Sequence, residues 1–478
     1  MFDLRGYVGP GPNVGTGRAH AQERPPSTAQ EERGGHLGGL DPLMSRAMER
    51  IDFGPWRPLP RGGRRPRWTT ASDAVAAIPD GARVFISGDV MTPNHLVEAI
   101  DEAADRWTRL EVVLPGMGRR IPLVRRAGRP FHFVSTQAGT LYRDLWGTGT
   151  VDVLPCRLSD HQRLCTPDGP LPCDVAVVQV SPPGPEGMVS LGMSVGVPLA
   201  VTLSAPLVIA QVNPAVPYVF GAGEIPVDDF DFLVEYHEPF RDRAAEAQLD
   251  PTSARIAELA AATIPDGATI QFGNGVMPDA ILRSLRARRG LRVHSGLVSE
   301  VCVELYEAGA VEAPMVATQM VNSPRMREFA HRNPAVQLGP VAYTHGAGVL
   351  GSLPRFTALL GAVEVALDGA VNSEMRGAEI ISGPGGAPDF AYGAALATGG
   401  RVVVALPSTA ANGRVSRIVT GIEPPRPVSL PAYLADLIVT EHGVADVRGL
   451  PLRARAAALT AIAGPAHRAT LAAYTPPT

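Results

Sequence analysis

Short apolar runs bounded by proline, glycine or polar turn residues recur along the whole chain. They lie at residues 110–114, 151–154, 174–180, 207–212, 291–294, 363–367, 401–406 and 436–439. Continuous apolar runs of this kind are typical of strands that are buried on both faces. Because segments long enough for helices separate the runs, the pattern predicts an α/β protein with largely parallel sheets covered by helices.

One stretch of the sequence occurs twice. Ile78 begins IPDGARVFISGDVMTP, and Ile264 begins IPDGATIQFGNGVMP, so the copies share IPDGA, VM and a following proline, with one inserted residue. Each copy predicts an Asp-Gly turn, a short strand, a glycine-containing loop and a helix with proline in its first turn. The helices are expected over residues 95–100 and 280–285. We interpret the repeat as an internal duplication of one α/β domain.

The chain has 478 residues, which is more than one hydrophobic core usually supports, so two domains are expected. We assign residues 67–240 to the N-terminal domain and 241–478 to the C-terminal domain, with a hinge near 238–250. Residues 1–66 are rich in Gly, Pro, Arg and Glu and lack periodicity, which predicts a largely disordered extension. Only residues 43–51 indicate a short helix there, and a first ordered helix is expected over 71–77.

The charged residues exclude several function classes. A formal charge of −4 gives no electrostatic case for a nucleic-acid partner. Every Lys/Arg position is arginine, which excludes Schiff-base lysine chemistry, a pyridoxal-phosphate lysine and the lysine of a P-loop.

Neither membrane insertion nor metal binding is expected. The most apolar stretch is broken by Pro198 and Pro206, and the N-terminus lacks the apolar run of a secretory signal, so a cytoplasmic protein is expected. The four cysteines have no metal-ligand spacing and predict reduced, buried thiols; they are Cys156, Cys165, Cys173 and Cys302.

Glycine-rich loops after strands are the candidate binding elements. In the second copy of the repeat, Gly273, Asn274 and Gly275 precede a helix, so the loop can direct backbone N–H groups and the positive end of a helix dipole at an anion. A tight connection without a ligand is the alternative. Further polar loops lie at residues 181–187, 371–374, 382–390 and 440–449. None of these loops provides a GxGxxG dinucleotide fingerprint or a GxSxG elbow.

Six blocks in register identify a resemblance over residues 70–470. They are DVAVVQVSPPGPEGMVSLG (174–192), VIAQVNPAVP (208–217), GNGVMPDAI (273–281), SGPGGAPDF (382–390), ALPSTAANGRVSRIV (405–419) and VTEHGVADVRG (439–449). The chain resembles the acetyl-CoA hydrolase/transferase family of CoA-transferases, which includes acetate, succinate and 4-hydroxybutyrate CoA-transferases. The resemblance implies two tandem CoA-transferase-type (NagB/Rossmann-like) domains and a cytoplasmic homodimer. It implies acyl-CoA and a carboxylate or other acyl acceptor as substrates, with the CoA thioester as substrate and no permanently bound cofactor.

The resemblance also implies roles for individual residues. The backbone N–H of Met277 and the loop at Gly385 and Gly386 would form an oxyanion hole for the thioester oxygen. Asn372 and Glu441 match polar positions of the same cleft. For Asn372 the alternative is a turn-forming side chain, and for Glu441 an ion pair with Arg448. The substrate would lie against Gly273, Asn274, Gly275, Gly296 and Gly383.

The chain departs from the family at the catalytic position. Family members carry a nucleophilic glutamate in a His-Ser/Thr-Glu-Met pattern that forms a glutamyl-CoA thioester, and here the pattern reads His294-Ser295-Gly296-Leu297. Glycine offers no nucleophile. We therefore expect direct attack by an acceptor, slow hydrolysis by water, or catalytically silent binding of acyl-CoA, possibilities that the sequence leaves open. Glu300, one helical turn further on, is a less favourable substitute because its direction from the backbone should differ.

Overall fold

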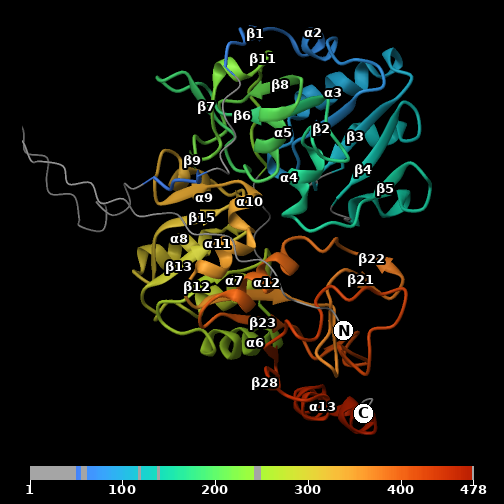
Figure 1. Ribbon diagram of the computed structural model, residues 1–478, viewed down its shortest axis with the longest axis vertical. Helices are drawn as coiled ribbons and strands as arrows, with labels where there is room; N and C mark the ends of the chain where they lie inside the picture. The colour runs from blue at the N-terminus through green and yellow to red at the C-terminus, as the bar shows by residue number, and fades with distance from the viewer. Residues whose placement is uncertain (1–49, 55–61, 117–119, 137–139, 242–248, 476–478) are drawn as a thin grey trace, which may run out of the picture. The chain divides into compact units, whose positions relative to one another are not determined.

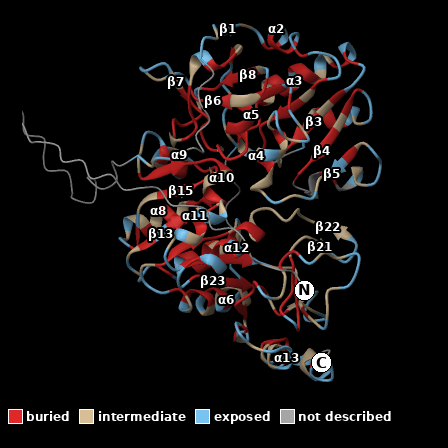
Figure 2. Ribbon diagram, viewed as in Figure 1, coloured by how far each residue is buried: buried red, intermediate tan, exposed pale blue. Residues whose placement is uncertain are grey.

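The computed structural model describes residues 50–54, 62–116, 120–136, 140–241 and 249–475 (Figure 1). Two large sheets dominate this part of the chain. Figure 2 shows that their strands are mostly buried. The sequence prediction of an α/β protein with largely parallel sheets is confirmed.

The first sheet pairs all of its strands in parallel, in the order β1-β11-β8-β6-β2-β3-β4-β5. Its strands are β1 (Arg67–Trp68), β2 (Arg83–Ile86), β3 (Leu110–Leu114), β4 (Phe131–Ser135), β5 (Val151–Val153), β6 (Val175–Val180), β8 (Leu207–Val212) and β11 (Phe232–Glu235).

The second sheet has the order β28-β27-β23-β18-β12-β13-β15-β17-β9, and only the pair β27–β28 is antiparallel. Its strands are β9 (Phe220–Gly221), β12 (Thr269–Gln271), β13 (Leu291–His294), β15 (Val311–Ala317), β17 (Val336–Leu338), β18 (Phe356–Gly361), β23 (Arg401–Ala405), β27 (Leu437–Thr440) and β28 (Gly443–Asp446). Since β9 precedes residue 240, the first half of the chain contributes an edge strand to the second sheet.

Helices and short sheets complete the described part. The helices are α2 (Ala71–Val75), α3 (Asn94–Glu102), α4 (Asp160–Cys165), α5 (Pro198–Ser204), α6 (Pro251–Ala262), α7 (Val276–Arg283), α8 (Glu300–Glu307), α9 (Pro324–Ala330), α10 (Val341–Thr344), α11 (Ala347–Ser352), α12 (Ala387–Leu396), α13 (Leu452–Ala461) and α14 (Arg468–Ala472). The short strands are β7 (Met188–Ser190), β10 (Glu224–Pro226), β14 (Leu297–Val298), β16 (Gln319–Met320), β19 (Glu364–Ala366), β20 (Val371–Asn372), β21 (Met375–Arg376), β22 (Glu379–Ile380), β24 (Thr409–Ala410), β25 (Val415–Ser416) and β26 (Ile418–Val419). Within the described residues, no helix is both long and apolar enough to span a bilayer.

The internal duplication is visible in the strand order. In the first sheet the run β11-β8-β6-β2-β3-β4-β5 follows the same chain sequence as β27-β23-β18-β12-β13-β15-β17 in the second. The duplicated stretches supply the equivalent strands β2 and β12. Their shared Asp-Gly turns also match, because Asp80 accepts the Thr108 N–H at 2.8 Å and Asp266 accepts the Arg289 N–H at 3.0 Å.

The apolar runs predicted most of the strands but misplaced one. The run at 363–367 contains β19, which pairs with β20 and β26 in a separate three-stranded sheet. The strand of the main sheet is β18, which pairs with β12 and β23. An apolar run indicates burial but does not specify the sheet that buries it.

Part of the N-terminal extension is packed against the folded chain. Phe53 is 4% exposed and its ring contacts Tyr343 edge-on, with centroids 5.1 Å apart. The Ile51 N–H donates to Gln337 Oε1 at 2.8 Å. Ordered packing therefore begins before residue 67, the expected start of the N-terminal domain, because an aromatic ring in a polar segment finds an apolar site. The helix expected at 43–51 lies largely outside the described residues; residues 50 and 51 themselves are not helical.

Candidate functional site

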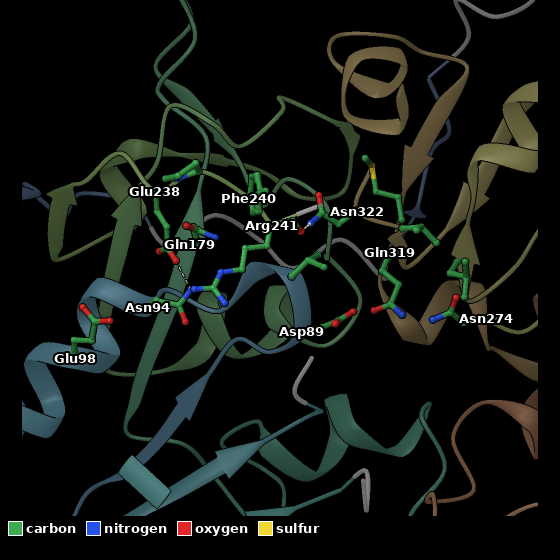
Figure 3. Close-up of a pocket in the computed structure, with 15 residues that line it drawn as sticks. Asp89, Asn94, Glu98, Gln179, Glu238, Phe240, Arg241, Asn274, Gln319 and Asn322 are labelled. Carbon is green, nitrogen blue, oxygen red and sulfur yellow. Dashed lines mark hydrogen bonds between the residues drawn. The ribbon is translucent and has the colours of Figure 1, made fainter. Parts of the chain in front are cut away.

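The two copies of the repeated loop meet at one cavity of about 720 Å³ (Figure 3). Asp89 comes from the first copy and Asn274 from the second. Leu297 and Gln319 also line the cavity. Leu297 follows Gly296 in the sequence, and the Gln319 N–H donates to the Gly296 carbonyl. The duplication therefore places both loops at the carboxyl ends of β2 and β12, where α/β sheets bind ligands.

Asp89 is a cavity residue that the sequence analysis missed. Its φ is 52°, and the equivalent position in the second copy, Gly275, has a φ of 133°. Left-handed backbone is uncommon outside glycine, although aspartate tolerates it better than most residues. Surrounding protein raises the pKa of the Asp89 carboxyl group, although the residue remains accessible from the cavity. Alignment of the two repeats was the signal that could have identified this position.

One wall of the cavity is a network of amides around Glu238, seen on the opposite side from Asn274 in Figure 3. Glu238 accepts hydrogen bonds from the side-chain amides of Asn94 and Gln211. Gln211 and Asn213 in turn donate to Gln179 Oε1, at 3.1 and 2.9 Å. These hydrogen bonds tie Glu238 to strands β6 and β8, whereas Oδ1 of Asn94 has no partner among the described residues. Glutamines within the apolar runs of β6 and β8 were the available sequence signal.

The glycine loop after β12 opens helix α7. Gly275 is the N-cap, with no side-chain capping hydrogen bond, and Met277 lies in the first turn. The first N–H groups of a helix have no partner within the helix and carry the positive end of its dipole. Gly273 and Gly275 are partly buried and Asn274 is exposed to the cavity. The helix begins at Val276, earlier than the expected 280–285, and the role of the Met277 N–H in an oxyanion hole stays a prediction.

The second glycine loop opens helix α12 in the same way. Gly385 has a φ of 57° and its carbonyl accepts the Leu158 N–H at 2.8 Å. Gly386 is the N-cap of α12. A Cβ on Gly386 would lie 2.6 Å from Nε2 of His345, so only glycine fits without displacement of the ring. Gly383 is partly buried, and its carbonyl accepts the Ser382 hydroxyl at 2.9 Å.

Gly296 lies between strands β13 and β14, two residues after the end of β13, and does not need to be glycine on steric grounds. A Cβ there would lie 3.6 Å from both His345 Nε2 and Phe390 Cε2, which is ordinary van der Waals contact. Its backbone is outside the left-handed region. A side chain at position 296 would therefore fit, with its Cβ in van der Waals contact with His345 and Phe390.

His345 is a second residue that the sequence analysis missed. It is 2% exposed, and its ring stacks obliquely on Phe390 with centroids 4.3 Å apart. Nδ1 lies 2.9 Å from the Thr344 hydroxyl, whereas Nε2 has no hydrogen-bond partner among the described residues. Burial, with a smaller effect of His294, lowers the pKa of His345 to about 3. A single histidine in a mixed segment gave no sequence signal.

Asn372 is buried and fully hydrogen-bonded. Its amide donates to Glu364 at 2.9 Å and to the Met375 carbonyl at 2.8 Å, and its oxygen accepts the N–H groups of Glu374 and Met375. These contacts are those of a turn-forming side chain, which was the alternative considered from the sequence. A role for Asn372 in binding acyl-CoA stays a prediction.

Glu441 lies in the β27–β28 turn and is held by Ser408. It accepts the Ser408 N–H at 2.9 Å and the Ser408 hydroxyl at 2.6 Å. The alternative ion pair with Arg448 is wrong, because Arg448 instead pairs with Asp436. Asp436 precedes β27 and so lies beside Arg448 across the hairpin, which sequence proximity alone did not reveal. Burial lowers the pKa of Arg417, and the negative charge of Glu441 acts in the opposite direction. The two side chains are therefore close enough for their charges to interact.

Two further expectations concern Glu300 and metal ions. Glu300 is the first residue of α8 and does not line the 720 Å³ cavity. In the described ranges, no three His, Cys, Asp or Glu side chains group in a way that could hold a metal ion.

Comparisons with known proteins agree on one family. The model of the acetyl-CoA hydrolase/transferase N-terminal domain matches residues 64–240, and that of the C-terminal domain matches residues 323–475. A 4-hydroxybutyrate coenzyme A transferase of Clostridium kluyveri is 34% identical over 411 residues, covering 84% of this chain and 95% of that protein. A succinyl-CoA:acetate/propanoyl-CoA:succinate CoA transferase of Fasciola hepatica is 31% identical, covering 89% and 92%. The crystal structure of RipA from Yersinia pestis is 27% identical with a TM-score of 0.78, covering 85% and 96%.

Proposed function

Since the chain belongs to the acetyl-CoA hydrolase/transferase family, we propose that it moves an acyl or CoA group from an acyl-CoA to an acceptor without a covalent glutamyl-CoA intermediate. The observation that carries this proposal is the combination of two glycine loops at helix N-termini with a glycine at position 296. The loops provide what a thioester needs for activation, and Gly296 provides no nucleophile.

The proposed oxyanion hole consists of the Met277 N–H and the Gly385–Gly386 loop. Both lie at the start of a helix, α7 or α12, where backbone N–H groups lack helical partners. Two such donors stabilise the negative charge that develops on a thioester oxygen during attack, and loss of one donor typically costs about 10²–10³ in rate. Asn274, Gly275 and Gly383 would border the bound thioester, as the sequence analysis expected.

The glycine at position 296 bears on the order in which the two substrates must bind and react. With a glutamate, an acyl-CoA can release its acid before the acceptor enters, because the enzyme holds CoA covalently. Without one, the acceptor must attack while the acyl-CoA is still bound. We therefore propose a ternary complex of enzyme, acyl-CoA and acceptor, with the acyl portion in the 720 Å³ cavity.

The substrate class follows from the relatives only as a proposal. Their names include 4-hydroxybutyrate, succinyl, acetate and propanoyl groups, which are short, and two of these carry a hydroxyl or a second carboxyl group. The amides of the cavity wall, Asn94, Gln179 and Gln319, suit hydroxyl or carboxyl groups of that kind. We also propose that the protein is a cytoplasmic homodimer.

The test incubates the purified chain with acetyl-, propionyl- and succinyl-CoA and with carboxylate, alcohol and amine acceptors. The proposal expects free CoA or a new thioester, with initial-rate lines that intersect when both substrates are varied. Saturable binding of the thioesters without turnover would leave an acyl-CoA-binding protein instead.

A further inference from the structure

We propose that His345 is the general base of this site and that its acceptor carries an O–H group, water being the simplest case. The inference rests on the proposed function and deepens it, because it names the class of acceptor and a catalytic residue. Four observations lead to it: where Nε2 lies, which nitrogen carries the proton, what space adjoins the ring, and what proton balance the reaction needs.

Nε2 of His345 lies close to both of the positions that matter most for thioester chemistry. It is 2.6 Å from the Cβ position of Gly386, in the proposed oxyanion hole, and 3.6 Å from that of Gly296. A side chain at 296 would thus start against this nitrogen. Of the three atoms nearest to a Cβ at Gly296, only Nε2 of His345 belongs to a titratable group.

The hydrogen bonds of Thr344 fix the tautomer of His345. The Thr344 hydroxyl lies 3.2 Å from the Pro340 carbonyl oxygen, which can only accept, so the hydroxyl proton is directed there. Oγ1 of Thr344 therefore accepts from the Nδ1–H of His345 at 2.9 Å. With its proton on Nδ1, the ring presents an unprotonated Nε2. This is the form that can take a proton from a nucleophile.

Nε2 is also the unsatisfied atom of an otherwise packed residue. Buried polar atoms almost always find a partner, and an exception points to a function or to a bound molecule. His345 lines a cavity of about 520 Å³ together with Arg157, Ser159 and Asp389. Nε2 itself is buried, so the acceptor has to reach it from this cavity. A water or hydroxyl group bound at Nε2 would supply the missing hydrogen bond.

The reaction balances with His345 as base. As the acceptor oxygen bonds to the thioester carbon, its proton passes to Nε2 and the carbonyl electrons move to the oxygen held by Met277 and Gly386. Collapse of this intermediate re-forms the carbonyl and breaks the C–S bond. The thiolate of CoA then takes the proton from Nε2. With water the products are a carboxylic acid and CoA; a carboxylate anion has no proton to give and would gain nothing from the base.

Burial keeps this base ready but limits its strength. Because burial lowers the pKa of His345 to about 3, the ring stays neutral throughout the working range of pH. The neighbouring titratable and charged groups are His294, which hydrogen-bonds the Thr344 carbonyl, and the residues Arg157, Asp160, Arg163, Asp389 and Tyr392, which line the cavity with His345. No carboxylate accepts from Nδ1, as it would in a Ser-His-Asp triad, so turnover is expected to be slow.

The experiment measures CoA release from acetyl-, propionyl- and succinyl-CoA in water enriched in ¹⁸O, with no added acceptor. The wild-type chain should release CoA, place ¹⁸O in the acid and keep its rate flat between about pH 5 and 8. His345→Gln should lower kcat by about 10²–10⁴ and leave KM within a factor of a few. His345→Ala should regain part of the rate with added imidazole.

His161→Gln is the matched control. His161 is buried, has Nδ1 beside a threonine hydroxyl and has an Nε2 without a partner among the described residues. It lies on α4, whose residues Asp160 and Gln162 line the 520 Å³ cavity, but His161 does not itself line that cavity. It should retain the wild-type rate, and melting curves confirm that each variant is folded. A folded His345→Gln with wild-type hydrolysis, or an equal loss in His161→Gln, overturns the inference.

The outcomes also separate this inference from the proposed function. Transfer to carboxylates without hydrolysis or alcohol transfer leaves the proposed function intact and refutes the role of His345. Absence of turnover with every acceptor refutes both.

Discussion

Gly386 and His345 are packed so closely that a Cβ on the glycine would lie 2.6 Å from Nε2 of the imidazole. The contact joins the N-terminus of α12 to the end of α10, so the proposed oxyanion loop and the proposed base hold one another in place. Because His345 is buried against Phe390, the ring has little room to move away.

Gly386→Ala should therefore lower both the free energy of unfolding and the rate of CoA release. Over-packing a filled site usually costs about 1–3 kcal/mol. Denaturant unfolding measures the free energy of unfolding, and CoA release measures activity. Gly348→Ala is the control, because a Cβ there meets nothing within 4 Å and the residue lies in helix α11. Equal stability of the two variants would contradict the packing argument.

Gly296→Glu should add the nucleophile that the family uses. The Cβ position has ordinary contacts, so the variant is expected to fold. It should gain CoA transfer between an acyl-CoA and a carboxylate, with parallel initial-rate lines and a covalent CoA adduct. Gly296→Gln has the same shape without the carboxylate and should gain neither. If the glutamate variant folds and forms no adduct, position 296 does not face the thioester carbon.

Stability should fall in mild acid because three buried histidines are held neutral. Burial lowers the pKa of His161 and His294 to about 4 and that of His345 to about 3, against about 6.5 in the unfolded chain. Between these values the unfolded state binds more protons, so the free energy of unfolding rises with pH. The stabilisation that the neutral histidines contribute is complete above about pH 6.5. It is lost as the pH falls toward 4, by at most ~1.4 kcal/mol per pH unit for each histidine.

Denaturant titrations between pH 4 and 7 measure this slope. His161→Asn should reduce it, since one of the three groups is removed. A stability that is flat across this interval would show that the three rings are not held neutral by the fold.

Asp89 should be replaceable by residues that accept left-handed backbone. At a φ of 52°, Asp89→Asn should keep the stability within a few tenths of a kcal/mol, whereas Asp89→Ala should lose about 1 kcal/mol more. Thermal and denaturant unfolding compare the two. The same two variants, assayed with a panel of acyl-CoAs, report whether the carboxyl group contributes to the cavity's acyl preference. An alanine variant as stable as the asparagine variant would contradict the backbone argument.

The sequence predicted the elements whose information is local. The repeat at Ile78 and Ile264 predicted two matching domains, and both sheets indeed share one strand order. The apolar run at 363–367 was assigned to the main sheet, because burial in the sequence does not distinguish β19 from β18. Alignment of Asp89 with Gly275 was available but its consequence, a carboxyl group in the cavity, depends on the fold.

The contacts of the site needed the structure because they join distant segments. His345 follows the four-residue helix α10 and meets Gly296 and Gly386 only after β13 and α12 are in place. Arg448 was considered as a partner of Glu441 because both lie in the polar segment 440–449, whereas the hairpin places Arg448 against Asp436. No periodicity or motif encodes either pairing.

Intact-protein mass spectrometry of the wild-type chain, quenched during steady turnover of an acyl-CoA, tests the central claim most directly. Turnover without a covalent intermediate predicts that CoA is released while the mass of the chain stays unchanged. A chain that accumulates bound CoA or an acyl group during turnover would contradict the account.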